Sequence, residues 1–367
     1  MKTKSMKILI ITISSVLALA IALIGITVTV KNQKLDDLAA MSSADLIEYI
    51  KESYSDATIS IAVTKNGETE YYVYGKDNET IDRTDSEYEI GSISKTFLAL
   101  LVSKAIKEGK LNLSDSISEY LDLDTDKYYP TIERLLTHTS GYKAYYFDSQ
   151  MIKNFFSKED NDFYGISKEK ILAKVKSVNL KDKDYGFVYS NFGISVLGLV
   201  LESIYDKDYT TLVNDYIKND LGLQNTICAS STGNMDNYWS WDMGDGYIPA
   251  GAIISNISDM AGYLNLYLTS SEDYVENTYS ILKTVTLENS TYNKLGIKVD
   301  SVGMTWMIDS IDGIVWHNGG TTSFNSYLAF NKEENAGVVA LSNLSPKESS
   351  VSMTILGIKI MKELLND

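Results

Sequence analysis

Gly91-Ser92-Ile93-Ser94-Lys95-Thr96-Phe97 is the stretch that decides the fold prediction, because a serine is followed three residues later by a lysine and then by an apolar run. Residues three apart on a helix lie on the same face, so Lys95 can reach the hydroxyl of Ser92. The N-terminus of that helix offers unpaired N–H groups and partial positive charge where an oxyanion would form. A nucleophile beside an amine indicates acyl-enzyme chemistry. The alternative is an N-cap serine followed by a solvated lysine, since Ser-x-x-Lys alone is a weak signal.

Composition restricts the partners and cofactors of this chain. Its 367 residues include 33 Lys and Arg against 49 Asp and Glu, for a net charge of -16. A body this acidic repels nucleic acid, so no nucleic-acid partner is expected. The single cysteine, Cys228, cannot form an internal disulfide. With only two histidines, the chain offers no multi-histidine zinc site, and we expect neither a metal nor a cofactor.

The N-terminal segment predicts a membrane anchor. Lysines precede an uncharged run over residues 8–30, which is long enough to cross the hydrocarbon core as a helix. Positive charge before the span keeps the N-terminus inside, so the rest of the chain would lie outside the cell membrane as a single-pass protein. The alternative is a cleaved secretory signal, although no clear Ala-x-Ala site follows the run.

The segments that follow predict one large domain after this anchor. Residues 43–54 have the pattern of an amphipathic helix, and residues 58–75 alternate around Asn66-Gly67, which is a strong hairpin signal. Further helices are expected at 92–108, 114–121, 132–136, 168–177, 190–204, 208–219, 258–268 and 349–365, with Ser258 as a cap. Strands are expected at 304–308, 314–316, 327–329 and 338–341. This order predicts an α+β sheet with strands from both ends of the chain and an inserted helical lobe.

The predicted boundaries follow from this pattern. We expect a cytoplasmic tip and transmembrane anchor at 1–31, a linker at 32–42, and a hydrolase domain at 43–367, with its α/β part at 43–90 and about 300–367 and its helical lobe at about 110–255.

Two further motifs could carry chemistry. Tyr189-Ser190-Asn191 precedes an apolar helix, and a phenol near a lysine ammonium can have its pKa lowered and serve as a proton shuttle. Asn191 could hold Lys95 or a substrate amide. The alternative for this tripeptide is a core tyrosine with an N-cap serine.

The second motif, residues 316–321, ends a predicted strand with Gly319 and Gly320, which would let a ligand backbone approach and could supply another oxyanion donor. His317 could donate to a substrate carboxylate or leaving group near neutral pH. The alternative is a glycine bulge with a surface histidine. The other histidine, His138, is expected to be structural.

The order of the motifs Ser-x-x-Lys, Leu-Leu-Thr-His-Thr-Ser-Gly, Tyr-Ser-Asn, Pro-Ala-Gly and His-x-Gly-Gly resembles the serine β-lactamase and penicillin-binding-protein superfamily, specifically its class C-like serine hydrolases. The resemblance covers roughly residues 43–365. It implies an antiparallel sheet with helices on both faces and a helical lobe. That branch holds class C β-lactamases, D-Ala-D-Ala carboxypeptidases, D-aminopeptidases and esterases.

The resemblance also implies a role for each residue. Ser92 would be acylated, Lys95 would deprotonate it, and Tyr189 would act as acid and base on the leaving group and the deacylating water. Asn191 would hold the lysine and the substrate amide, and the N–H groups of Ser92 and Gly320 would form the oxyanion hole. Two departures argue against a dedicated β-lactamase: His317 and Asn318 stand in place of the family's Lys-Thr, and the usual Pro-Gly turn before Tyr-Ser-Asn is missing.

These observations predict a membrane-anchored, extracytoplasmic serine hydrolase. We expect it to act on D-alanyl amides or esters of the cell envelope, in a peptidoglycan stem peptide or a D-alanylated polymer. The alternatives are a β-lactamase and a penicillin-binding sensor or scaffold without turnover.

Overall fold

The computed structural model describes residues 34–76, 81–124, 126–229, 233–287, 290–347 and 349–366. The apolar run at 8–30, expected to be a membrane anchor, lies outside these ranges. Within them, no helix combines the length and the apolar character needed to cross a membrane.

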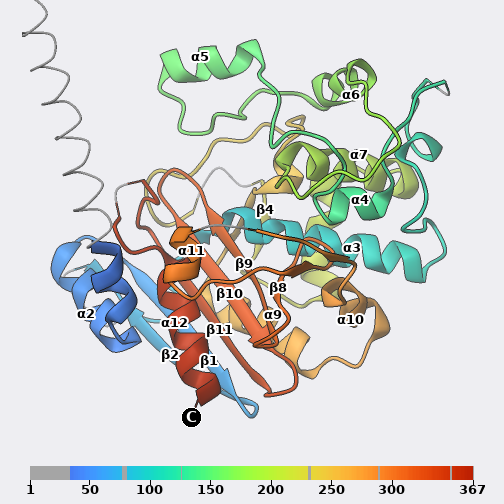
Figure 1. Ribbon diagram of the computed structural model, residues 1–367. Helices are drawn as coiled ribbons and strands as arrows, with labels where there is room; N and C mark the ends of the chain where they lie inside the picture. The colour runs from blue at the N-terminus through green and yellow to red at the C-terminus, as the bar shows by residue number, and fades with distance from the viewer. Residues whose placement is uncertain are drawn as a thin grey trace, which may run out of the picture.

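An antiparallel sheet of eight strands is the centre of the described structure (Figure 1). Its spatial order is β2-β1-β11-β10-β9-β8-β7-β6. The strands are β1 (Ile59–Lys65), β2 (Glu68–Tyr74), β6 (Lys283–Thr284), β7 (Ser301–Val302), β8 (Met307–Asp309), β9 (Ile314–Gly320), β10 (Asn325–Asn331) and β11 (Ala336–Ser342). Because β1 pairs with β11 along its full length, the expected sheet made from both ends of the chain is confirmed.

The hairpin of β1 and β2 forms where the sequence predicts it. Asn66 and Gly67 both have positive φ, at 53° and 86°. A two-residue turn with this geometry matches the right-handed twist of the flanking strands, which is why Asn-Gly is favoured there.

Helices cover both faces of the sheet (Figure 1). On one face lie α12 (Met353–Asn366) and α2 (Ser43–Ser53), and on the other lie α9 (Ile257–Thr269) and α3 (Ser94–Lys107). Alternate residues of β11 face the two cores, since Val338 packs with the α12 layer and Val339 with the α9 layer. A Cβ at Gly357 would lie 2.1 Å from the Tyr327 ring, so the glycine lets α12 approach β10 closely.

The remaining helices lie outside the layers just described. They include α4 (Ile132–Leu136), α5 (Ser149–Ser157), α6 (Lys168–Ser177), α7 (Asn191–Tyr205), α8 (Tyr209–Asp215), the π-helical turn η4 (Tyr216–Asp220), α10 (Asp273–Tyr279) and α11 (Ser290–Lys294). A second, small sheet joins β3 (Tyr88–Glu89), β5 (Ile253–Ser255) and β4 (Ile227–Cys228).

Three local predictions are wrong. The expected strand through residues 304–308 is interrupted, because Thr305 has φ 66° and forms the turn between β7 and β8. The expected helix at 114–121 is only the 3-10 turn η3 (Ile117–Glu119). The cap of α9 is Asn256, whose side chain accepts from the backbone N–H of Asp259, and Ser258 lies inside the helix.

Candidate active site

Ser92 lies in a short 3-10 turn, η2 (Gly91–Ile93), between β3 and α3. Gly91 has φ +49°, and a Cβ there would lie 2.6 Å from the backbone nitrogen of Gly320. A Cβ at Gly319 would lie 2.0 Å from the carbonyl oxygen of Ile90. Only glycines allow these two segments to approach so closely. The turn that carries Ser92 therefore lies directly against the end of β9, with Gly320 beside it.

Lys95 is fully buried next to Ser92. Its Nζ lies 2.8 Å from the Oγ of Ser92 and 2.5 Å from the carbonyl oxygen of Ala250. Burial holds the pKa of Lys95 well below its ordinary value of 10.5, and none of the ion pairs among the described residues involves it. In its unprotonated form the amine can donate one proton to Ala250 while its lone pair accepts the Ser92 hydroxyl proton.

Tyr189 stands on the other side of the lysine, whose Nζ lies 5.1 Å from the centre of the tyrosine ring. The Tyr189 hydroxyl is buried and makes no hydrogen bond to any described residue. Burial raises the pKa of Tyr189, and the nearby Ser92 hydroxyl lowers it by less. The expected lowering of this pKa is therefore wrong, because the cost of burying a phenolate outweighs the stabilisation that its neighbours provide. The resting phenol keeps its proton.

His138 positions the tripeptide that contains Tyr189. Its Nδ1 accepts the backbone N–H of Ser190 at 3.1 Å, and its carbonyl oxygen accepts that of Val188 at 2.8 Å. The imidazole ring also packs against the ring of Tyr189, with centres 4.5 Å apart. Burial, with a smaller contribution from Lys95, lowers the pKa of His138, so the ring is neutral with its proton on Nε2. These contacts agree with the structural role expected for it.

Asn191 begins α7 but does not hold the lysine in this conformation. Its Oδ1 is buried without a hydrogen-bond partner in the described part of the chain. The recorded hydrogen bonds of Lys95 go instead to Ser92 and to Ala250 in the Pro-Ala-Gly turn. The expected contact between Asn191 and Lys95 is therefore not among these hydrogen bonds.

His317 differs most from its expectation. It is buried, and its Nδ1 donates to the carbonyl oxygen of Asn318 at 2.6 Å. Burial, reinforced by Lys95, lowers the pKa of His317 to about 3. The ring is thus uncharged at neutral pH and does not line the cavity described below. Neither a surface histidine nor a charged donor to a carboxylate fits this position.

Glu89 is a site residue that sequence reasoning missed. Its carboxylate is buried and accepts from the Thr321 hydroxyl at 2.6 Å and from the backbone N–H of Trp239 at 2.7 Å. Burial raises the pKa of Glu89 to about 7. Thr321 follows Gly320 directly, so this carboxyl group connects both segments that surround Ser92. The available signal was an acidic residue between apolar neighbours just before the nucleophile turn.

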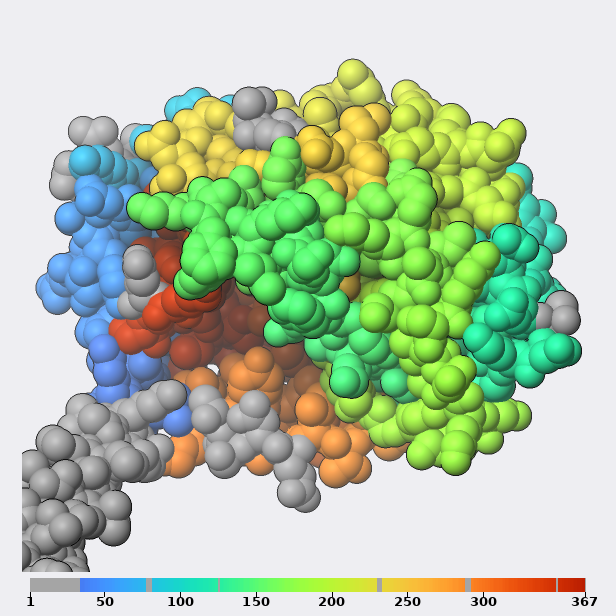
Figure 2. Space-filling model, turned by 90° about the horizontal axis from the view of Figure 1, so that it is seen from above, coloured from blue at the N-terminus to red at the C-terminus, as the bar shows by residue number. Residues whose placement is uncertain are grey.

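An open cavity of about 610 Å³ adjoins these groups. Ser92, Tyr189, Asn318, Gly319 and Gly320 lie on its wall, and no charged side chain is among its lining residues in the described ranges. Figure 2 shows the surface hollowed between the orange residues near 290 and the green helical region, with red C-terminal residues at the floor. A substrate can therefore reach the Ser92 hydroxyl from solvent.

A serine hydroxyl beside a buried lysine, with a phenol nearby and an open cavity in front, defines a serine hydrolase that works by acyl transfer. Residues 44–359 match the family model described as Beta-lactamase, and the chain belongs to that family. The expected membership of the serine β-lactamase and penicillin-binding-protein superfamily is thus confirmed.

Individual relatives are distant. The chain is 23% identical to Protein flp of Staphylococcus aureus over 314 residues, which cover 78% of this chain and 59% of that protein. The octameric penicillin-binding protein homologue from Pyrococcus abyssi has a TM-score of 0.71 and 20% identity over 88% of this chain and 76% of its own. The β-lactamase/D-alanine carboxypeptidase of Yersinia pestis has a TM-score of 0.70 and 19% identity over 87% and 95%. The chain thus spans about three fifths of the first curated relative, and the structural likenesses show the fold.

Proposed function

We propose that this chain hydrolyses D-alanyl esters or amides of the cell envelope through an acyl-enzyme on Ser92. The observation that carries the proposal is the 2.8 Å distance between the Ser92 hydroxyl and a lysine amine whose pKa burial lowers. An amine in this state can accept a proton at neutral pH, which an exposed lysine does poorly.

Acylation then follows from the positions of the groups. The Ser92 hydroxyl transfers its proton to Lys95 while its Oγ attacks the scissile carbonyl. The N–H groups of Ser92 and Gly320 would stabilise the oxyanion. Tyr189 donates its proton to the departing oxygen or nitrogen, and the Lys95 ammonium returns a proton to the phenolate. The leaving group departs as a neutral alcohol or amine.

Deacylation uses the same groups in reverse. A water molecule entering from the cavity gives a proton to Tyr189, which passes one on to Lys95, while the water oxygen attacks the acyl carbon. The bond to Ser92 Oγ then breaks, and the Lys95 ammonium restores the serine proton. The net reaction adds the elements of water across the ester or amide, and the enzyme returns to its starting protonation.

Charge favours an ester over a penicillin. Penicillins and peptide C-termini carry a free carboxylate, and no cation stands among the described residues that line the cavity. His317 is uncharged, and the chain carries a net charge of -16. A β-lactamase is the alternative, supported by family membership and by the name of the Yersinia pestis relative. A penicillin-binding sensor that acylates without turnover is a further alternative. We also propose that the run at 8–30 anchors the domain outside the cell membrane.

A substrate panel tests this proposal. A D-alanyl ester, a peptide ending in D-Ala-D-Ala and a penicillin are incubated with wild type, Ser92→Ala and the exposed control Ser177→Ala, and products are quantified. Ester turnover that is lost only in Ser92→Ala supports the proposal. Penicillin turnover exceeding that of the ester supports the β-lactamase. A lasting penicillin adduct without turnover of any substrate supports the sensor.

A further inference from the structure

We propose that the cavity beside Ser92 binds an apolar, uncharged leaving group, so that the best substrates are esters of aliphatic or aromatic alcohols. This rests on the proposed acyl transfer at Ser92 and names the part of the substrate that the cavity recognises.

The composition of the cavity wall gives the chemical class. Apolar side chains from several separated segments line it, among them Phe187, Leu295, Ile297, Val299, Met307 and Trp316. No Lys, Arg, His, Asp or Glu of the described chain contributes to this lining. Small-molecule sites of this size are usually apolar with a few placed polar groups. Here the polar members of the lining are uncharged, and they are Ser92, Tyr189, Tyr292, Asn318, Asn325, Ser352 and Thr354.

The position of the cavity relative to the reacting groups assigns it to the leaving group. Tyr189, which would protonate the departing atom, lines the cavity, and so does its neighbour Phe187. Asn191 and Lys95 do not line it. A group that extends into the cavity from the scissile bond therefore passes the phenol, as a departing alcohol must to receive its proton.

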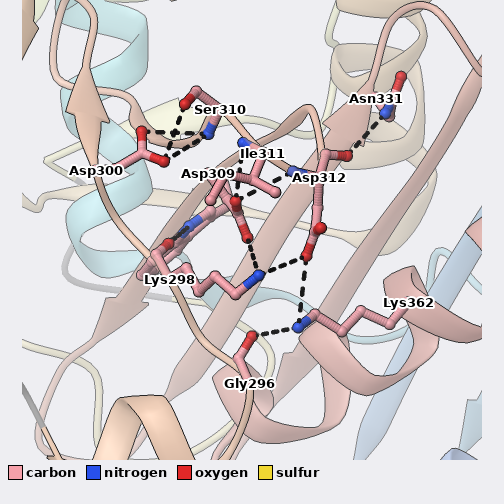
Figure 3. Close-up of polar contacts among 10 residues, drawn as sticks. Gly296, Lys298, Asp300, Asp309, Ser310, Ile311, Asp312, Asn331 and Lys362 are labelled. Atoms are coloured by element: carbon pink, nitrogen blue, oxygen red, sulfur yellow. Dashed lines mark hydrogen bonds and ion pairs between the residues drawn. The ribbon is translucent and has the colours of Figure 1, made fainter.

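A cluster of polar contacts includes two residues adjacent in sequence to the cavity wall, Gly296 and Lys298 (Figure 3). Ile297 and Val299 contribute to the cavity, and Lys298 between them has its Nζ 3.2 Å from a carboxylate oxygen of Asp312 and 4.0 Å from one of Asp309. The Nζ of Lys362 donates to the carbonyl oxygen of Gly296 at 2.6 Å.

Trp316, another lining residue, is joined by a hydrogen bond to the segment that contains Ile297 and Val299. The indole N–H of Trp316 donates to the carbonyl oxygen of Lys298 at 3.2 Å. Trp316 lies on β9, the strand that ends at Gly320, so the apolar wall is connected to the strand beside Ser92. Because these contacts already order the apolar surface, a substrate does not have to pay the cost of ordering it on binding.

The step itself balances without any added reactant. The Oγ of Ser92 forms a bond to the acyl carbon, the bond from that carbon to the alkoxy oxygen breaks, and the oxygen takes the Tyr189 proton. The product that leaves is a neutral alcohol. Each methylene buried in the cavity contributes about 0.8 kcal/mol at most.

Esters that share one acyl group and differ only in the alcohol test this inference. Ethyl and hexyl esters of D-alanine and of acetic acid have leaving groups of nearly equal acidity, so only the apolar area differs. We expect kcat/KM for the hexyl ester to exceed that for the ethyl ester at least about tenfold, given four added methylenes. A hexyl chain ending in a carboxylate should lose this gain. Equal rates for ethyl and hexyl esters, or a gain that survives the carboxylate, would overturn the inference.

A charge introduced into the cavity wall provides a second test, with an apolar substitution at the same position as its control. Val299→Asp should abolish the preference for the hexyl ester, measured as the ratio of kcat/KM for the hexyl ester to kcat/KM for the ethyl ester, while Val299→Ile should keep this ratio at least about tenfold. A preference that persists in Val299→Asp overturns the assignment of the cavity.

The two acyl groups separate this inference from the proposed function. If acetyl esters react with the hexyl preference and D-alanyl esters do not react, the D-alanyl assignment fails and the inference stands. If D-alanyl esters react without any dependence on the alcohol, the inference fails and the proposed function stands. Absence of reaction with every ester overturns both.

Discussion

The hydroxyl of Thr321 donates to the carboxylate of Glu89 across 2.6 Å. This bond joins the residue that follows Gly320 on the strand end to the strand that leads into Ser92. A second bond comes from the neighbouring strand β10, where the Ser326 hydroxyl donates to the carbonyl oxygen of Ile90 at 2.8 Å. The two proposed oxyanion donors are therefore positioned by polar contacts behind them as well as by close glycine packing.

Glu89 predicts how stability depends on pH. Burial raises the pKa of Glu89 from 4.5 to about 7, so the folded state favours the protonated form. Its contribution is fully present below pH 4.5 and is lost as the pH rises to about 7, by about 3 kcal/mol at most. Glu89→Gln resembles the protonated form, so its free energy of unfolding relative to wild type should increase between pH 5 and 8. Denaturant titrations measure it, with the exposed Glu68→Gln as the control, and a constant difference contradicts the prediction.

The burial of Lys95 leads us to expect that kcat/KM does not require high pH. Because burial lowers the pKa of Lys95 well below 10.5, the amine loses its proton at lower pH than an exposed lysine does. We expect kcat/KM for an alkyl ester to change little between pH 7.5 and 9.5. Lys95→Arg should lower kcat by about three orders of magnitude or more, since a guanidinium cannot accept the proton. A rise in kcat/KM of a hundredfold across this range would show that the lysine is protonated in the resting enzyme.

Tyr189 predicts a dependence on the leaving group. Tyr189→Phe removes the proton donor, which should lower kcat/KM by about 10²–10⁴ for an alkyl ester. A nitrophenyl ester of the same acyl group needs no proton on its leaving oxygen, so its acylation should fall by less than about tenfold. Burst kinetics with both esters provide the measurement. Equal losses in the two acylation rates would remove Tyr189 from the role of acid.

Gly319 predicts a steric effect next to the nucleophile. A Cβ there would lie 2.0 Å from the Ile90 carbonyl oxygen and 2.4 Å from the Ser326 hydroxyl, so β9 must move away from the turn that carries Ser92. We expect Gly319→Ala to lower kcat at least about a hundredfold and stability by about 1–3 kcal/mol. Gly186→Ala, where a Cβ would meet nothing within 4 Å, is the control for both measurements. Wild-type kcat in Gly319→Ala would contradict this account of the contact.

Asp312 predicts an effect on binding through the cavity wall. Asp312→Asn weakens the ion pairs with Lys298 and Lys362 that lie behind Ile297 and Val299. The KM for a hexyl ester should rise about two- to fivefold, and kcat should remain within twofold, because exposed ion pairs contribute little individually. Steady-state kinetics with hexyl and ethyl esters test this, and a loss of kcat alone would contradict it.

Local sequence signals predicted much of the fold. Asn66-Gly67 identified a hairpin because few residues adopt two consecutive positive φ values. Period-two patterns at both ends of the chain identified strands that pair with each other in the structure. The turn at Thr305 was not predictable from the pattern, because apolar residues continue through it and tertiary packing determines the positive φ.

The candidate site was predicted only in part, because local spacing is visible in the sequence and burial is not. The spacing of Ser92 and Lys95 predicts their contact, since one helical turn separates them. Burial is a property of the whole fold, so the uncharged state of His317 and the raised pKa of Tyr189 were not visible in the sequence. The role of Glu89 depends on its hydrogen bond with Thr321, a residue far away in the sequence, so the sequence near Glu89 does not reveal it.

The location of the acyl group during turnover tests the central claim most directly. Tyr189→Phe, in which deacylation is expected to be slowed, is mixed with a D-alanyl nitrophenyl ester, quenched in acid and digested for mass spectrometry. We expect one D-alanyl group on Ser92 of this variant. The double variant with Ser92→Ala should carry no D-alanyl group. An acyl group on another residue, or undiminished ester hydrolysis by Ser92→Ala in the otherwise wild-type chain, would contradict it.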